Sequence, residues 1–344
     1  MAGLLWDVYC RVVDNLGDAG VCWRLAANLA LREQRVRLVI DDASPLAFMA
    51  PEGLPDVQVL PWPGPAVAGD VVVEAFGCDP PAPTVAAMAA RARPPVWINL
   101  EYLSAEDYVE RSHGLPSPQW NGPGRGLTKW FFYPGFSAAT GGLLREPGLM
   151  ARRAAFDRDA WLAQQGIANR PGERIVTLFC YDNTALPALL QDLAAEPTLL
   201  LLTPGPAQRQ VSQALPTVRL QALPWLEQAG FDALLWSADL NFVRGEDSLV
   251  RAIWAGAPFV WQAYPQHDGA HRAKVEALLA VLQAPPAVAD AWRAWNGLGP
   301  TWPGVQALAP ALFLQLRHTL QAQQDLATQL LAFVETHPAD TAAC

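Results

Sequence analysis

The chain has 344 residues, of which 51% are hydrophobic and 17% charged, so it is a globular protein rather than a disordered one. Its length predicts two domains. The net charge of −9 argues against broad nucleic-acid binding, and no apolar run approaches the ~20 residues that a membrane helix needs, so neither nucleic acid nor a membrane is an expected partner.

The N-terminus and the cysteines predict the cellular compartment. The first residues lack a basic segment and include Arg11 and Asp14, which argues against a signal peptide. The cysteines are odd in number and form no C-x-x-C pair. We therefore expect a cytoplasmic protein with reduced, mostly buried thiols at Cys10, Cys22, Cys78, Cys180 and Cys344.

The first half of the chain predicts a Rossmann-like α/β domain. An apolar strand is followed by a loop rich in turn-forming residues, a helix with apolar residues at helical spacing, and a second strand. The loop is not G-x-G-x-x-G, so a dinucleotide site is not indicated. The predicted elements are strands at 4–13, 35–41, 70–76 and 95–100 and helices at 21–32 and 82–93.

Polar residues follow several of these strands. In a parallel sheet the carboxyl ends of the strands point toward the crevice that binds ligands. We therefore expect these side chains to converge on one edge of the sheet: Asp14, Asn15, Asp18, Asp79 and Glu101.

Two carboxylates in the first loop are candidates for acid–base chemistry. Asp14 and Asp18 lie four residues apart in a predicted turn. One could act as a general base while the other orients the substrate. In the alternative interpretation, Asp14 closes an Asx-turn and Asp18 caps the following helix.

The second half of the chain repeats the α/β pattern after a linker at 169–173, so a ligand cleft between two domains is expected. We predict a first domain over 1–170, a second over 171–317, and a C-terminal helix, about 318–336, that returns to the first. The expected elements are strands at 175–180, 198–203 and 218–222, helices at 186–196 and 207–215, and two helices within 304–334.

The stretch from Asp239 to Lys274 contains the most informative pattern. It predicts a strand at 240–243, a turn at 244–248 and a helix at 249–255 that opens at Asp247 or Ser248. Gly256 ends this helix, and 259–261 forms the next strand.

The chemistry of this turn suits a nucleotide sugar. A helix N-terminus presents free N–H groups to an anion, and Arg244 adds a planar donor fork suited to phosphate. Glu246 and Asp247 would repel a bare phosphate but suit a ligand that also carries hydroxyls. An ordinary βα turn with solvated charges accounts for the same spacing.

Aromatic and amide side chains at the strand ends are candidates for contacts with a base or sugar. Phe179, Tyr181 and Phe242 could stack on a nucleobase, and Gln262 or Gln266 could hydrogen-bond to a base or sugar. In the alternative interpretation, the aromatic side chains pack in the core and the glutamines belong to a polar loop.

The only metal-like spacing is that of His267 and His271, four residues apart. No glutamate or third histidine joins them at a suitable distance, so we predict no metal site.

Five segments together resemble a known family. They are DNLGDAGVCWR (14–24), EYLS (101–104), FCY (179–181), RGEDS (244–248) and AGAPFVW (255–261). In this order they resemble the protein-arginine rhamnosyltransferases that modify translation elongation factor P, the EarP family. The resemblance extends from Trp6 to about Lys274 and more weakly into the tail.

This resemblance implies an α/β protein of the GT-B class, with two Rossmann-like domains facing across a cleft. It implies transfer of L-rhamnose, with inversion, from dTDP-β-L-rhamnose to an arginine side chain of elongation factor P, which activates that factor. Neither a cofactor nor a metal is implied, and the partners are the nucleotide-sugar donor and the protein acceptor.

The resemblance also assigns residues. It implies catalytic roles for Asp18, as the base, and Asp14. The substrate-binding residues it implies are Asn15, Gly17, Phe179, Tyr181, Phe242, Arg244, Glu246, Asp247, Ser248 and Gln262. The chain departs from the family pattern at Ala257, where a lysine is common, and around His267, where acidic residues are common.

Two other functions are compatible with the residues. One is a GT-B transferase that uses another nucleotide sugar and a small-molecule or lipid acceptor. The other is a protein that binds a nucleotide sugar without catalysing its transfer.

Overall fold

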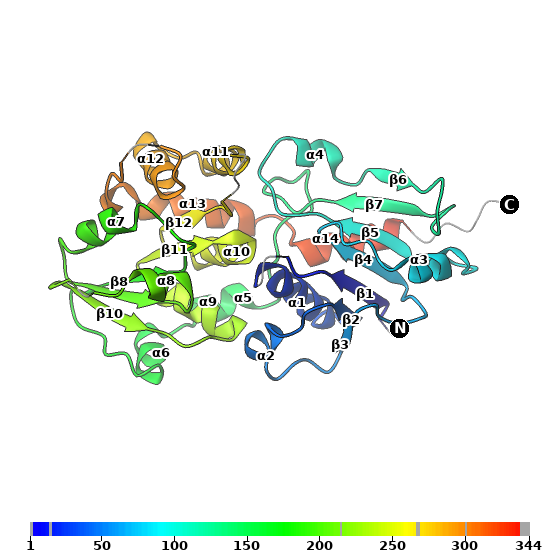
Figure 1. Cartoon of the computed structure of the whole chain (residues 1–344), viewed down its shortest axis with the longest axis horizontal. Helices are drawn as coiled ribbons and strands as arrows, with labels where there is room; N and C mark the ends of the chain where they lie inside the picture. Colours follow the sequence, from blue (N-terminus) through cyan, green and yellow to red (C-terminus); the bar gives the residue numbers. More distant parts are fainter. Residues whose placement is uncertain (1–2, 14–15, 214, 266–268, 300, 338–344) are drawn as a thin grey trace. The chain divides into compact units, whose positions relative to one another are not determined.

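The computed structural model describes residues 3–13, 16–213, 215–265, 269–299 and 301–337. The chain forms two compact units, one made of Met1–Pro147 with Gln323–Cys344 and the other of Gly148–Ala322. Each unit contains a sheet with helices on its faces (Figure 1). Within the described ranges, none of the helices has the length and apolar character to cross a membrane.

The sheet of the first unit has the strand order β3-β2-β1-β4-β5-β7-β6. All neighbouring strands are parallel except β6 and β7. Because β2 and β3 lie on one side of β1 and β4 on the other, the order reverses between β1 and β4, where ligands of such sheets bind. The strands are β1 (Leu5–Cys10), β2 (Arg35–Ile40), β3 (Val57–Pro61), β4 (Val71–Ala75), β5 (Val96–Leu100), β6 (Pro116–Pro118) and β7 (Thr128–Phe132).

Helices cover both faces of this first sheet. Residues of α1 and α14 share one apolar cluster with β1, β4 and β5, and Val85 and Met88 of α3 belong to a second cluster with Tyr9, Val72 and Trp97. Alternate residues of β4 enter the two clusters, as the two-residue period of a strand requires. The helices are α1 (Gly17–Ala30), α2 (Leu46–Met49), α3 (Ala82–Ala89), α4 (Tyr108–Ser112) and α14 (Leu326–Thr336).

The C-terminal helix α14 completes the core of the first unit. Asp325 caps the helix by accepting a hydrogen bond from the Thr328 backbone N–H at 3.1 Å, and it also pairs with Arg32 of the loop after α1. Leu326, Ala327 and Leu330 are buried in the cluster that contains β1 and β4.

The sheet of the second unit is parallel, in the order β10-β9-β8-β11-β12. The run Thr198–Leu202 is fully buried, as expected for a central strand covered on both faces. The strands are β8 (Arg174–Leu178), β9 (Thr198–Leu202), β10 (Val218–Ala222), β11 (Leu240–Arg244) and β12 (Phe259–Gln262).

The helices of the second unit connect these strands and follow them. They are α5 (Leu149–Ala154), α6 (Arg158–Gln164), α7 (Leu186–Leu193), α8 (Pro206–Gln210), α9 (Gln228–Ser237), α10 (Gly245–Ala255), α11 (His271–Leu282), α12 (Pro286–Trp295), the 3₁₀ turn η1 (Val305–Ala307) and α13 (Pro310–Gln321). A buried ion pair between Arg251 and Asp232, with Nε–Oδ1 at 2.7 Å, joins α10 to α9.

The predicted domain boundary after residue 170 was too late. Trp161, Leu162 and Ile167 pack in one cluster with Ile175 and Leu199, so the segment from residue 148 onward belongs to the second unit. At the other end, the division falls between Ala322 and Gln323.

Candidate functional site

Asp18 lies in the first turn of α1, directly after the loop that follows β1. Its carboxylate accepts a hydrogen bond from the Val13 backbone N–H at 2.8 Å, and the residue is only 3% exposed. Gly17 is the first residue of the helix, and Leu16 occupies the capping position without a side-chain bond. The alternative that Asp18 caps the helix is therefore wrong, because the carboxylate binds the preceding loop instead. Asp14 and Asn15 lie outside the described residues.

The surroundings of Asp18 suit an acidic side chain. The N-terminal end of a helix carries partial positive charge, which favours an acidic residue in the first turn. Its hydrogen bond from the Val13 N–H fixes the position of the carboxylate. The structure thus presents Asp18 as a fixed carboxylate beside the switch point of the first sheet.

Three buried cysteines, Cys22, Cys78 and Cys180, have raised pKa values. The pKa of Cys22 is raised well above its usual value by a hydrogen bond with Cys10 and by burial. Burial raises the pKa of Cys78 and of Cys180 to about 12. The described cysteines are all free and buried.

In the second unit, strand β11 passes directly into helix α10. Arg244 is the capping residue, with an extended φ of −135°, and Gly245 begins the helix at a φ of 68°. The Ser248 hydroxyl donates to the Arg244 carbonyl and accepts from the Arg244 backbone N–H at 3.2 Å. The predicted turn at 244–248 and the predicted caps Asp247 and Ser248 are therefore wrong.

The acidic residues that the sequence analysis singled out lie at the start of α10. Glu246 and Asp247 lie in its first turn, half-buried, where the helix dipole favours acidic groups. Ser248 is only 4% exposed, so its hydroxyl fixes the junction between strand and helix rather than facing solvent. Trp261 also holds this junction, because its indole Nε1–H donates to the Gly245 carbonyl at 2.8 Å.

The Arg244 guanidinium lies over two aromatic rings. Its central carbon is 4.3 Å from the centroid of Tyr181 and 4.6 Å from that of Phe179. Its Nε is buried and has no hydrogen-bond acceptor among the described residues. A cation with unused donor capacity beside a helix N-terminus can bind an anion such as a diphosphate.

Gln262, at the end of β12, is buried at 4% exposure. Its Oε1 accepts from the Tyr181 backbone N–H at 2.9 Å, and its Nε2 donates to the Asp182 carbonyl at 3.4 Å. The amide therefore positions the loop that carries Tyr181. The Tyr181 ring meets that of Tyr264 edge to face, with centroids 5.4 Å apart.

Phe242 is a core residue rather than a surface for stacking. It is fully buried, and its ring packs against Trp295 at 4.6 Å and Trp302 at 5.9 Å. The prediction that its side chain stacks on a nucleobase is therefore not supported by the structure, because no ring face is accessible. Phe179 is half-buried, between Arg244 and the ring of Phe231 at 5.5 Å.

The structure thus brings part of the predicted site together. The strands β8, β11 and β12 are neighbours, and their carboxyl ends carry Phe179, Tyr181, Arg244 and Gln262 beside the start of α10 (Figure 1). Sequence reasoning missed Asn296, which holds this edge by accepting from the Ala263 N–H and donating to the Trp261 carbonyl. No local motif marks Asn296, because it lies 33 residues or more from both partners.

Only one histidine of the i,i+4 pair lies in the described part of the chain. His271 begins α11, and His267 lies outside the described residues. The described ranges contain no cluster of three or more His, Cys, Asp or Glu side chains that could hold a metal ion.

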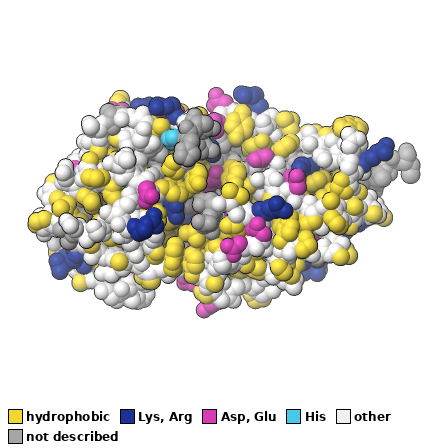
Figure 2. All heavy atoms as spheres, viewed as in Figure 1, with side chains coloured by type: hydrophobic (Ala, Val, Ile, Leu, Met, Phe, Trp, Pro, Cys, Tyr) yellow, Lys and Arg dark blue, Asp and Glu magenta, His cyan; other side chains and the backbone are white. Residues whose placement is uncertain are grey.

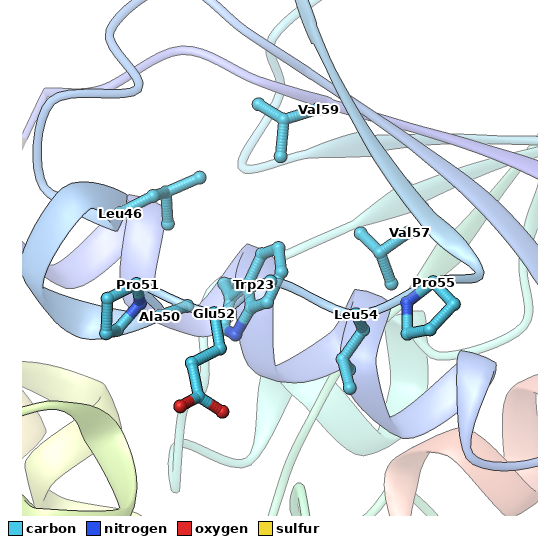
Figure 3. A pocket seen from close by; sticks show the side chains of 10 residues that line it. Trp23, Leu46, Ala50, Pro51, Glu52, Leu54, Pro55, Val57 and Val59 are labelled. Carbon is cyan, nitrogen blue, oxygen red and sulfur yellow. The ribbon is translucent and has the colours of Figure 1, made fainter.

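The first unit also contains an apolar recess of about 450 Å³ (Figure 3). Trp23 of α1 forms its floor, and α2, β3 and the segment between them form its walls. It contains none of the predicted site residues. On the face shown in Figure 2, basic side chains are interspersed with acidic and apolar ones and form no continuous basic stripe.

Comparison with known proteins gives concordant matches. The family described as "Elongation-Factor P (EF-P) rhamnosyltransferase EarP" matches residues 6–335. The protein-arginine rhamnosyltransferase of Pseudomonas putida is 43% identical, with 95% of this chain and 98% of that protein covered. That of Pseudomonas aeruginosa is 41% identical at the same coverage.

Solved structures agree with the fold. The structure described as the basis for EarP-mediated arginine glycosylation of translation elongation factor EF-P is 31% identical and gives a TM-score of 0.68, with 97% of this chain and 99% of that one covered. Spinosyn rhamnosyltransferase SpnG gives 0.54 at 12% identity, with 95% and 99% covered, which shows the fold alone. The predicted α/β fold of the GT-B class is confirmed.

Proposed function

Because the chain belongs to the elongation factor P rhamnosyltransferase (EarP) family, we propose that it transfers L-rhamnose from dTDP-β-L-rhamnose to an arginine side chain of elongation factor P. The transfer inverts the anomeric carbon and activates the factor in the cytoplasm. The observation that carries this proposal is the family match over residues 6–335, together with the cationic start of α10 in the second unit.

The second unit is proposed to hold the donor. The diphosphate of dTDP gains negative charge as the sugar leaves, and the α10 N-terminus and Arg244 supply positive potential there. The carboxylates of Glu246 and Asp247 accept hydrogen bonds from sugar hydroxyls. Gln262 holds the loop that places Tyr181 beside the nucleotide.

The first unit is proposed to prepare the acceptor. A guanidinium has a pKa above ~12, stays protonated and is a poor nucleophile. A carboxylate must therefore orient it and accept a proton as the new C–N bond forms. Asp18 is held for this role by Val13, with Asp14 and Asn15 beside it in sequence as further candidates to contact the guanidinium. Inversion is a single displacement, so it needs no protein nucleophile.

The direct test is intact-mass analysis of elongation factor P after incubation with this protein and dTDP-β-L-rhamnose. We expect a gain of one deoxyhexose, and an unchanged rate when a chelator such as EDTA is present, because the helix and Arg244 take the place of a metal. Transfer from other nucleotide sugars to small acceptors, with elongation factor P unmodified, would support the other GT-B function. Binding of dTDP without transfer to any acceptor would support a non-catalytic protein.

Replacing Glu246 by alanine is expected to weaken binding of dTDP-β-L-rhamnose about tenfold, because hydrogen bonds to a charged acceptor are lost. Isothermal titration calorimetry measures this. Glu227→Ala is the matched control, since Glu227 is an exposed carboxylate at the start of α9 in the same unit. Equal affinities of the two variants would contradict the role of Glu246.

A further inference from the structure

In the first unit, Glu101 is a carboxylate without a cation. It follows β5, is half-buried, and accepts a hydrogen bond from Asn99 Nδ2 at 2.8 Å. In the described part of the unit, no lysine, arginine or histidine pairs with it. Glu74, on the neighbouring strand β4, is by contrast neutralised by Lys129 at 2.6 Å.

Aromatic residues lie at the same edge of the sheet as Glu101. Tyr102 is 38% exposed, and its ring stacks on Phe76 with centroids 4.3 Å apart and planes 10° apart. Tyr133, which follows β7, has its pKa raised by burial and then by the nearby Glu101 carboxylate. The rings of Tyr133 and Tyr108 meet edge to face at 5.8 Å. The segments after β4, β5 and β7 thus bring ring systems to the edge of the sheet where Glu101 lies, because Phe76 bonds to the Leu100 backbone and Glu101 to the Phe132 backbone.

Asn99 supplies an independent sign of an absent ligand. It is only 4% exposed, and its Oδ1 is buried without a hydrogen-bond donor among the described residues. A buried acceptor without a donor is costly, and a ligand that brings N–H groups would remove that cost. We call Asn99, Glu101, Tyr102 and Tyr133 the Glu101 cluster.

The chemistry of the Glu101 cluster selects a cation. A carboxylate repels phosphates and other acids, whereas aromatic faces attract ammonium and guanidinium groups. Both lysine and arginine side chains carry several N–H donors and no acceptor, which matches a carboxylate beside an unsatisfied amide oxygen.

The cluster and Asp18 follow different strands of the first sheet. In the sheet order, β4 lies between β1 and β5, so the strand before Asp18 and the strand before Glu101 are about 10 Å apart at ~4.8 Å per strand. The two carboxylates therefore belong to separate segments of the chain. Both lie at the carboxyl edge of the sheet, on either side of the switch point between β1 and β4.

We propose that the Glu101 cluster binds a second basic side chain of the protein acceptor, distinct from the arginine that receives the sugar. This inference rests on the proposed function. It makes the cluster a specificity site, which selects acceptors that carry a further positive charge near the modified residue.

Replacing Glu101 by glutamine is expected to raise KM for elongation factor P about tenfold, with kcat within twofold and donor affinity unchanged. The glutamine oxygen can still accept from Asn99, so the fold is kept, which the melting temperature checks. Glu110→Gln removes the same charge from an exposed position on α4 and should leave KM unchanged. Tyr102→Phe should retain KM, whereas Tyr102→Leu should raise it.

A double-mutant cycle identifies the partner. Each lysine and arginine of elongation factor P, other than the modified arginine, is changed to methionine and tested with the wild-type and Glu101→Gln enzymes. One substitution should raise KM with the wild type and have no further effect with Glu101→Gln. If every substitution has an additive effect on KM, or if Glu101→Gln lowers kcat alone, the inference is overturned. The proposed function still stands in that case, provided that the wild-type enzyme transfers the sugar. Absence of wild-type transfer overturns the proposed function itself.

Discussion

Replacing Asp18 by asparagine is expected to lower kcat for transfer to elongation factor P by about 10²- to 10⁴-fold, the range typical of a lost general base. The asparagine oxygen can still accept the hydrogen bond from the Val13 N–H, so the loop after β1 keeps its position. The amide has no basicity with which to accept a proton from the guanidinium. Geometry is therefore retained while the chemistry is lost.

Mass-shift kinetics measure this effect, and calorimetry with dTDP-β-L-rhamnose should show unchanged donor affinity. Asp42→Asn is the matched control, because Asp42 is an exposed carboxylate after β2 in the same unit. Asp18→Ala should lose both turnover and thermal stability, since it also removes the acceptor for Val13. Near-normal turnover of Asp18→Asn would exclude Asp18 as the base.

Replacing Arg251 by methionine is expected to lower the free energy of unfolding of the second unit by about 3–5 kcal/mol. Arg251 is 2% exposed and Asp232 5%, and their side chains form two parallel hydrogen bonds between α10 and α9. Removing the guanidinium leaves the Asp232 carboxylate buried without its arginine. Because α10 also carries Glu246, donor affinity should fall with stability.

Hydrogen exchange of the α9 and α10 amides measures the loss within that unit. Arg158→Met is the matched control, because Arg158 pairs with Asp239 in a similar two-bond geometry but in a solvent-exposed position. The Arg158→Met control should lower the free energy of unfolding by less than about 1 kcal/mol. The double variant Arg251→Met, Asp232→Leu should recover most of the loss, since neither buried charge remains. Equal effects of the two single variants would show that burial of the pair is unimportant.

Local sequence patterns predicted the elements that depend on local physics. The apolar run Val71–Ala75 forms the buried strand β4, and Gly256 ends α10 in the left-handed conformation, with a φ of 74°. These features follow from hydrophobic period and backbone sterics, which the sequence carries directly. The family resemblance and the GT-B fold were confirmed by the comparisons.

Features that depend on contacts between residues far apart in the chain could not be predicted from local sequence patterns. The helix α10 begins three residues before Ser248 because that hydroxyl bonds to the Arg244 backbone, which competes with the predicted capping role. Phe242 is buried by Trp295 and Trp302, more than 50 residues away along the chain. The sequence predicted that strand ends meet at one edge of the sheet, but which side chains surround Glu101, and that no cation pairs with it in the described residues, depends on contacts between separate strands.

The first unit is built from two separate segments of the chain, and this affects the order in which the protein folds during synthesis. Its sheet emerges from the ribosome early, yet Leu326, Ala327 and Leu330, which cover that sheet, are translated after the whole second unit. The second unit is one continuous segment and can close while the tail is still being made. The usual order, in which N-terminal domains finish folding first, is therefore reversed, and the nascent first sheet is expected to expose apolar surface until α14 has been made.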